Sequence, residues 1–330
     1  MAKTPVKTVS AKKVKPAVKV AQDKKAPIKT KKPVAKAAAS TKVVEKKISK
    51  KGSSVKIVKL HKPGETTSTE KGLYVKAVEL HMLGNLQEAW LGYQAVLKLV
   101  PNHFEALHSM GLIAAQMRNY PMAIELFKKA LEIRPENPVV FNNLGNVYSS
   151  LNEKNAALES YDQALALDPN YADAYSNRGI LLTSLKQYPD AIASFEKSIQ
   201  IRPKFSETYF HQANLYAETG KLDLALKGYN HTLSLRADHP VALNNRGVVL
   251  KALMQLQAAL ESFNQALTLN PSYAEAFNNR AVVLVSLKKF EEALESYDKA
   301  IALRVNYKDA ENGRANLLGI YKVSNESRLN

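Results

Sequence analysis

Asparagine side chains recur in the sequence at a spacing that would align them for hydrogen bonding. One series of equally spaced positions holds Asn143, Asn177, His211, Asn245 and Asn279. Because an amide carries both a donor and an acceptor, a row of such side chains would bind the backbone of an extended peptide without selecting its side chains. Neighbouring amides would widen this polar strip: Asn142, Asn146, Asn214, Asn244 and Asn278.

Catalytic and metal-binding patterns are weak in comparison. The seven histidines are scattered, and the sequence contains neither a His-Glu-x-x-His motif nor a glycine-rich phosphate loop. The pairs His103/His108 and His231/His239 are spaced too loosely to indicate a metal site. We therefore predict a binding protein that has no catalytic residues, no metal and no cofactor.

The spacing of the asparagines belongs to a 34-residue period that extends over most of the chain. Place 8 of each repeat is Gly or Ala, place 20 is Ala, place 24 is Tyr or Phe, and place 32 is Pro in five of seven cases. Three columns that agree over seven windows, and a fourth that agrees in five, identify an internal repeat. Counted from Glu70, the windows are 70–103, 104–137, 138–171, 172–205, 206–239, 240–273 and 274–307.

Each column has a packing reason in a pair of antiparallel helices. Small residues at places 8 and 20 let the two helices approach closely, the aromatic ring at place 24 fills the space beside them, and proline at place 32 ends the second helix. Pro121 and Pro189, at place 18, suit the first position of a second helix, and Pro138 and Pro240 suit the start of a first helix. We expect an all-α fold of seven stacked hairpins.

Residues 308–330 begin like an eighth window and then lose the pattern. Glu311 replaces the apolar residue of most windows, whereas Leu317, Leu318 and Tyr321 keep an apolar stripe. A stack of repeats needs a terminal element with a polar outer face. We therefore predict a capping helix that frays after about Val323.

The period, the four columns and segments such as YADAYSNRGILLTSLKQYPDAIASFEKSIQIRP resemble tetratricopeptide repeats over residues 70–307. The resemblance implies a right-handed superhelical solenoid whose first helices line a concave groove that holds a protein or peptide. Ala237 and Val305 depart from the pattern by replacing the turn proline, and Lys76 stands at an interior place. We expect looser junctions there.

Segments such as ADAYSNRG resemble the repeat region of O-linked N-acetylglucosamine transferases, in which a row of asparagines holds substrate polypeptide. This resemblance implies an alternative function, the substrate-binding or accessory arm of a protein glycosyltransferase system, although no transferase domain follows the repeats. The preferred interpretation is a non-catalytic scaffold that binds an extended peptide. A third interpretation is that the asparagines are only tolerated polar residues on a solvated face.

Arginine recurs at place 7. We expect these side chains to lie along apolar surface near the junctions between hairpins, and so to stabilise the fold more than to bind a ligand. The lysine-rich clamp of chaperone-tail-binding repeat proteins is absent here, because Val139, Asp173 and Glu207 fill one of its places. The arginines in question are Arg178, Arg246, Arg280 and Arg314.

Residues 1–69 differ in composition from the rest of the chain. They contain 20 lysines, three acidic residues and no aromatic residue, and they account for the formal net charge of +17. Such a segment cannot bury enough apolar surface to fold, so we predict a disordered tail. It resembles the lysine-, alanine- and proline-rich arms of histone H1-like proteins.

Lysines neutralise phosphates without reading bases, which favours nonspecific binding of DNA, RNA or an anionic surface; a solubilising arm is the alternative. The sequence contains no cysteine, no signal peptide and no apolar run of membrane-spanning length, so we expect a cytoplasmic protein. The lysines that would bind the polyanion include Lys12, Lys13, Lys24, Lys25, Lys31, Lys32, Lys46, Lys47, Lys50 and Lys51.

Overall fold

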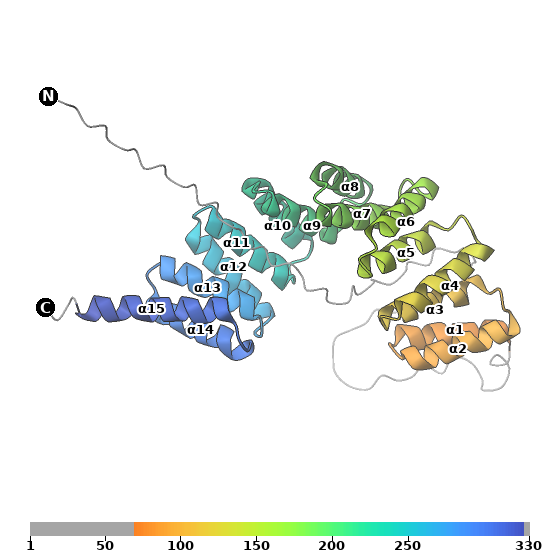
Figure 1. The fold of residues 1–330 in the computed structure, drawn as a ribbon, viewed down its shortest axis with the longest axis horizontal. Helices are drawn as coiled ribbons and strands as arrows, with labels where there is room; N and C mark the ends of the chain where they lie inside the picture. Colours follow the sequence, from red (N-terminus) through yellow and green to blue (C-terminus); the bar gives the residue numbers. More distant parts are fainter. Residues whose placement is uncertain (1–68, 327–330) are drawn as a thin grey trace, which may run out of the picture. The chain divides into compact units, whose positions relative to one another are not determined.

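A computed structural model describes residues 69–326 of the chain. Over this range the chain forms fifteen α-helices and no β-strand, as expected for an all-α repeat protein (Figure 1). The predicted lysine-rich tail lies outside the described residues. No helix between residues 69 and 326 is long and apolar enough to cross a membrane.

The helices follow the 34-residue windows. The first helix of every window begins at place 1 and ends at place 13, and the second begins at place 17 and ends at place 30. The first helices are α1 (Glu70–Met82), α3 (Phe104–Gln116), α5 (Pro138–Ser150), α7 (Ala172–Ser184), α9 (Ser206–Glu218), α11 (Pro240–Ala252) and α13 (Ala274–Ser286). The second helices are α2 (Leu86–Leu99), α4 (Tyr120–Ile133), α6 (Lys154–Leu167), α8 (Tyr188–Ile201), α10 (Leu222–Leu235), α12 (Leu256–Leu269) and α14 (Phe290–Leu303).

Two details of the helix ends differ from the expectation. The second helices begin at place 17, so Pro121 and Pro189 occupy the second helical position instead of the first. Proline is tolerated there because the first backbone N–H groups of a helix have no partner within the helix. The last helix, α15 (Lys308–Glu326), continues beyond Val323 and is longer than any of the first helices.

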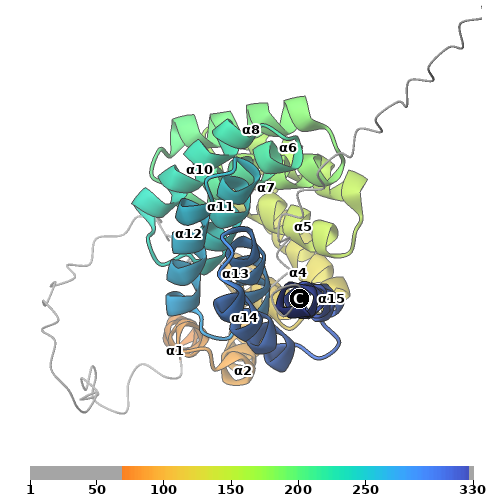
Figure 2. The same ribbon diagram turned by 90° about the vertical axis from the view of Figure 1, so that its left-hand side faces the viewer.

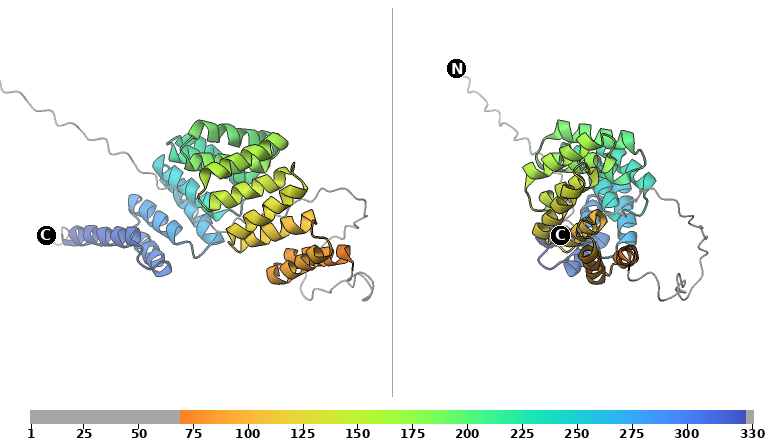
Figure 3. Two further views of the ribbon diagram at one scale, coloured as in Figure 1. Left: turned by 45° about the vertical axis from the view of Figure 1, so that its right-hand side comes forward. Right: turned by 90° about the vertical axis from the view of Figure 1, so that its right-hand side faces the viewer.

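The described residues form two compact units that divide between Pro169 and Asn170. We call residues 69–169 the N-terminal unit and residues 170–326 the C-terminal unit. Within each unit every first helix packs against its own second helix, and each second helix packs against the next first helix (Figures 1 and 3). First helices also contact each other: α3 with α5 in the N-terminal unit, and α7 with α9, α9 with α11 and α11 with α13 in the C-terminal unit. Figure 2 labels α11 and α13, the last of these pairs.

The repeat columns form the core. All seven alanines at place 20 are 0% exposed, and the aromatic rings at place 24 are at most 3% exposed. The helices of one hairpin approach most closely near places 8 and 23. A Cβ atom added to Gly228, at place 23, would lie 2.8 Å from the Cβ of Ala213, at place 8. Where place 8 is glycine, an added Cβ atom would lie 2.5–2.6 Å from the ring at place 24, so both contacts favour a small residue at place 8.

The turn between the two helices of each hairpin has one fixed conformation. Place 15 has a positive φ in all seven windows, between +59° and +82°. Glycine occupies it only at Gly84 and Gly220, and Asn152 is the next most compatible residue. In the other four windows an arginine, two lysines or a methionine adopts this left-handed conformation, namely Arg118, Lys186, Lys288 and Met254.

Ion pairs join the two ends of four hairpins. An acidic residue at place 2 accepts a hydrogen bond or ion-pair contact from an arginine at place 31. In the remaining three windows both partners are absent together. These pairs remain partly open to solvent, so each contributes only about 0–1 kcal/mol. They are Glu105 with Arg134, Asp173 with Arg202, Glu207 with Arg236, and Glu275 with Arg304.

Candidate functional site

The amide residues predicted to bind a peptide all lie on first helices. In the N-terminal unit, α5 carries Asn142, Asn143 and Asn146. The remaining members belong to the C-terminal unit, where α7, α9, α11 and α13 are successive neighbours. Those members are Asn177 on α7, His211 and Asn214 on α9, Asn244 and Asn245 on α11, and Asn278 and Asn279 on α13.

Four of these amides in the C-terminal unit form a continuous hydrogen-bonded series, which we call the amide network. Asn279 Nδ2 donates to Asn244 Oδ1 at 3.0 Å. Asn244 Nδ2 donates to Asn245 Oδ1 at 3.2 Å, and Asn245 Nδ2 donates to Asn214 Oδ1 at 3.1 Å. The hydroxyl of Tyr229 donates to the same Asn214 oxygen at 2.6 Å. The network therefore crosses three first helices and ends on the core ring of α10.

The N-terminal unit has shorter connections of the same kind. Asn143 Nδ2 donates to His108 Nε2 at 2.9 Å, which joins α5 to α3. Tyr161, at place 24, donates its hydroxyl proton to Asn146 Oδ1 at 2.8 Å. Burial raises the pKa of Tyr161, so its hydroxyl keeps the proton that it donates. Amides on both units thus bond first to the protein itself.

The burial of the amides differs from the expected open strip. Asn142, Asn244 and Asn245 are 4%, 0% and 1% exposed, whereas the other seven predicted site residues are partly exposed. Asn245 lies beside the place-24 ring of the preceding hairpin, Tyr229, whereas Asn142 and Asn244 occupy place 5 of their helices. A buried amide must find partners within the fold, and these three cannot present their polar groups freely to a ligand.

Asn278 is the exception to this internal pairing. Its Oδ1 atom is buried and is the only such side-chain atom among the described residues that has no hydrogen-bond partner. In the neighbouring hairpin Asn244 occupies the same place 5 and accepts from Asn279, at place 6 of the next window. The corresponding donor for Asn278 would come from residue 313, which is glycine. A Cβ atom there would lie 2.6 Å from Tyr297 Cε1, so a larger side chain does not fit.

The histidines have structural partners. His103 and His239 cap α3 and α11 by accepting from the backbone N–H groups of Ala106 and Ala242, each at 3.2 Å. Burial lowers the pKa of His108 to about 4. The pKa of His211 is lowered to about 4, mainly by burial, with Glu207 opposing the shift and His239 adding to it. In the described part of the chain no group of three acidic, His or Cys residues is arranged to hold a metal ion.

The arginines at place 7 connect consecutive helices, which bears out their expected structural role. Arg280 donates through Nε to Asn264 Oδ1 of the preceding hairpin at 2.8 Å, and through Nη1 to Ser296 Oγ of its own hairpin at 2.7 Å. These contacts hold the guanidinium at the junction between hairpins. The same pattern places Arg178 on Ser194, Arg246 on Ser262 and Asn230, and Arg314 on Asp298.

Sequence profiles of the tetratricopeptide repeat match the chain in several places. They cover residues 104–137, 172–205, 240–273 and 274–307, which have the bounds of four of the windows defined above. Two further profiles of this repeat match residues 126–159 and 145–185. The combined matches extend over more than half of the chain. The chain is a tetratricopeptide-repeat protein.

Several solved structures of other proteins are similar to this one. PilW, a widely conserved type IV pilus biogenesis factor, is 26% identical, with 66% of this chain and 99% of PilW covered and a TM-score of 0.58. A tetratricopeptide repeat protein from Parabacteroides merdae is 19% identical, with 76% and 98% covered and a TM-score of 0.57. YrrB, which has an unusual peptide-binding site, is 28% identical, with 57% and 97% covered and a TM-score of 0.49. No curated protein sequence gives a significant match.

Sequence reasoning missed the tyrosines that end the hydrogen-bonded series. Asparagine occurs at place 9 in only two windows, as Asn146 and Asn214, and both windows have tyrosine at place 24. Where place 24 is phenylalanine, place 9 is always apolar. A comparison of these two columns would have indicated the Tyr161 and Tyr229 contacts.

Proposed function

We propose that this tetratricopeptide-repeat protein is a non-catalytic scaffold that binds an extended peptide segment of another protein on the face formed by its first helices. The tetratricopeptide fold supports a protein-interaction role. The C-terminal unit is the preferred location because α7, α9, α11 and α13 lie in succession there and carry seven of the ten candidate residues. The amide network fixes the positions of the polar groups before a ligand binds, which reduces the entropic cost of binding.

The single observation that carries the proposal is the acceptor of Asn278. A buried oxygen without a donor costs about 1–3 kcal/mol, and the residue at the place that supplies the donor in the neighbouring hairpin is here a glycine. The backbone N–H of an extended peptide can supply this donor, because a backbone group needs no room for a side chain beside Tyr297. We therefore assign Asn278, which is partly exposed as a residue, the role of binding the peptide backbone by a turn of its side chain that brings this oxygen to the surface next to Asn279.

The test is a selection of binding peptides from a random library displayed on phage, with the full chain as the target. A recovered peptide is then titrated against the wild type and against Asn278→Ala. We expect the variant to weaken binding about fivefold, because one hydrogen bond contributes about 1 kcal/mol. Asn312→Ala is the matched control, since Asn312 occupies the same place in α15 but is exposed.

Two results would contradict the proposal. Failure of the wild type to recover any peptide would refute peptide binding as the function. Equal affinities for the wild type and Asn278→Ala, with circular dichroism spectra that match, would remove Asn278 from the site. Variants at Asn244 or Asn245 are unsuitable for this purpose because these residues are buried and would alter the fold.

For residues 1–69 we propose nonspecific polyanion binding, which would bring the scaffold and its bound protein to nucleic acid. The support is the composition alone, 20 lysines with three acidic residues. Filter binding of duplex DNA to the full chain should fall steeply as salt rises, and a chain that begins at residue 70 should not retain DNA at low salt. Retention of DNA by the truncated chain would contradict this part of the proposal. Separately, recovery of a glycosyltransferase bound to the repeats would favour the alternative function.

A further inference from the structure

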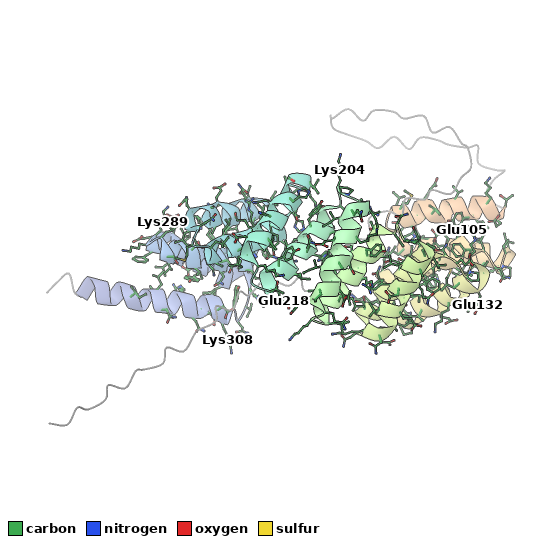
Figure 4. The ribbon with its side chains drawn as sticks, turned by 90° about the horizontal axis from the view of Figure 1, so that it is seen from above. Glu105, Glu132, Lys204, Glu218, Lys289 and Lys308 are labelled. Carbon is green, nitrogen blue, oxygen red and sulfur yellow. The ribbon has the colours of Figure 1, made fainter. Side chains whose placement is uncertain are left out.

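Lys251 differs from the other lysines of the C-terminal unit. It lies in the last turn of α11 and, among the lysines of that unit whose side chains the structure describes, it alone is partly buried instead of exposed. The others are exposed, and Lys204 and Lys289 point away from the packed helices into solvent (Figure 4). Burial of the side chain lowers the pKa of Lys251, and no acidic group contributes to the shift.

The position of Lys251 places it on the face that carries the amide network. Asn244, Val248 and Lys251 are separated by four and three residues, so they share one face of α11. At the same place 12, the neighbouring helices α9 and α13 carry Ala217 and Val285. Lys251 is therefore the only charged residue at place 12 of these three helices.

No group in the described part of the C-terminal unit balances this charge. Lys251 has no ion pair or hydrogen bond within the described residues, whereas the acidic residues Asp173, Glu207 and Glu275 pair with arginines. Glu218, at place 13 of α9, accepts a hydrogen bond from the hydroxyl of Tyr188 at 2.9 Å. A partly desolvated ammonium without a counter-ion is costly in the free protein. A bound anion would remove part of this cost.

We propose that Lys251 selects an acidic residue, Asp or Glu, in the extended peptide that the C-terminal unit binds. This inference rests on the proposed function and adds a sequence preference to backbone binding by Asn278. The ligand would pair one carboxylate with Lys251 and place an apolar side chain against the partly exposed Val285. A lysine supplies a single point charge on a flexible stem, which suits one carboxylate.

The experiment is the same phage selection with the full chain, followed by sequencing of the recovered peptides. We expect Asp or Glu to be enriched at one position for the wild type, and this enrichment to disappear for Lys251→Met, which keeps the apolar stem. A recovered acidic peptide should bind Lys251→Met about five- to thirtyfold more weakly than the wild type, as expected for loss of one partly buried charge pair. Lys251→Glu should shift the enrichment to Lys or Arg.

Lys227→Met is the matched control, because Lys227 is an exposed lysine of α10. Peptides recovered without an acidic position, or with the same acidic position for Lys251→Met, would overturn this inference and leave peptide binding intact. Failure of the wild type to recover peptides would refute the proposed function and this inference with it. A second library with free carboxyl termini distinguishes a side-chain carboxylate from a terminal one, and enrichment of the terminal carboxylate alone would overturn the assignment to Asp or Glu.

Discussion

Replacement of Asn245 by alanine tests whether the amide network stabilises the C-terminal unit. Asn245 is 1% exposed, donates to Asn214 and accepts from Asn244. Without it the Nδ2 group of Asn244, a residue with 0% exposure, loses its acceptor, which costs about 1–3 kcal/mol. Asn214 Oδ1 keeps the hydroxyl of Tyr229 as a donor. With about 1 kcal/mol more for the space left behind, we expect Asn245→Ala to lower the free energy of unfolding by about 2–4 kcal/mol.

The assay is urea unfolding followed by circular dichroism, combined with hydrogen exchange of α9, α11 and α13 to locate the change. Exchange in these three helices should accelerate in Asn245→Ala. Asn312→Ala should change stability by less than about 0.5 kcal/mol, as expected for an exposed residue. If Asn245→Ala changed the free energy of unfolding by less than about 0.5 kcal/mol, the network would not stabilise the unit and its amides would be available to a ligand. The reasoning about Asn278 would then fail as well.

Three further predictions concern helix contacts, turns and pH. Gly228→Ala should destabilise the protein by about 1 kcal/mol, because overpacking against Ala213 outweighs the better helix propensity of alanine, and addition of Ala213→Gly should restore the urea midpoint. Met254→Gly should raise the thermal midpoint by the equivalent of about 0.5–1 kcal/mol, since Met254 has a φ of +60° and is 76% exposed; an unchanged midpoint would contradict it. His108 and His211 have pKa values of about 4 in the folded protein, compared with the ordinary value of 6.5. The free energy of unfolding should therefore be highest above about pH 6.5 and fall by about 1–3 kcal/mol per histidine toward pH 4. A urea midpoint that does not change between pH 7 and 4.5 would contradict neutral buried histidines.

Much of the fold follows from the sequence because its columns are set by close packing. Alanine at place 20 and the ring at place 24 are buried in every hairpin. Because these residues must face the core, they fix the register of each hairpin. The proline positions located the helix starts within one residue. The arginines at place 7 were also interpreted correctly, since their place in the hairpin determines which helices they can reach.

The candidate site was less predictable from the sequence. A period identifies the face of a helix but does not say which way an amide turns, and Asn245 turns toward Asn214 and Tyr229 instead of solvent. The ion pairs between places 2 and 31 were missed because the partners are 29 residues apart. Lys251 was overlooked because a single lysine has no pattern; its significance comes from neighbours on other helices.

The contacts within each unit have a consequence for evolution and engineering. Because a hairpin packs only against itself and its immediate neighbours, no core residue depends on how many hairpins the array contains. Removal of residues 240–273 would join His239 to Ala274, so place 34 would still lead to place 1. The array can therefore gain or lose whole repeats while the packing contacts between neighbouring helices stay the same. Under the proposed function, the length of peptide that it binds would change in steps of one repeat.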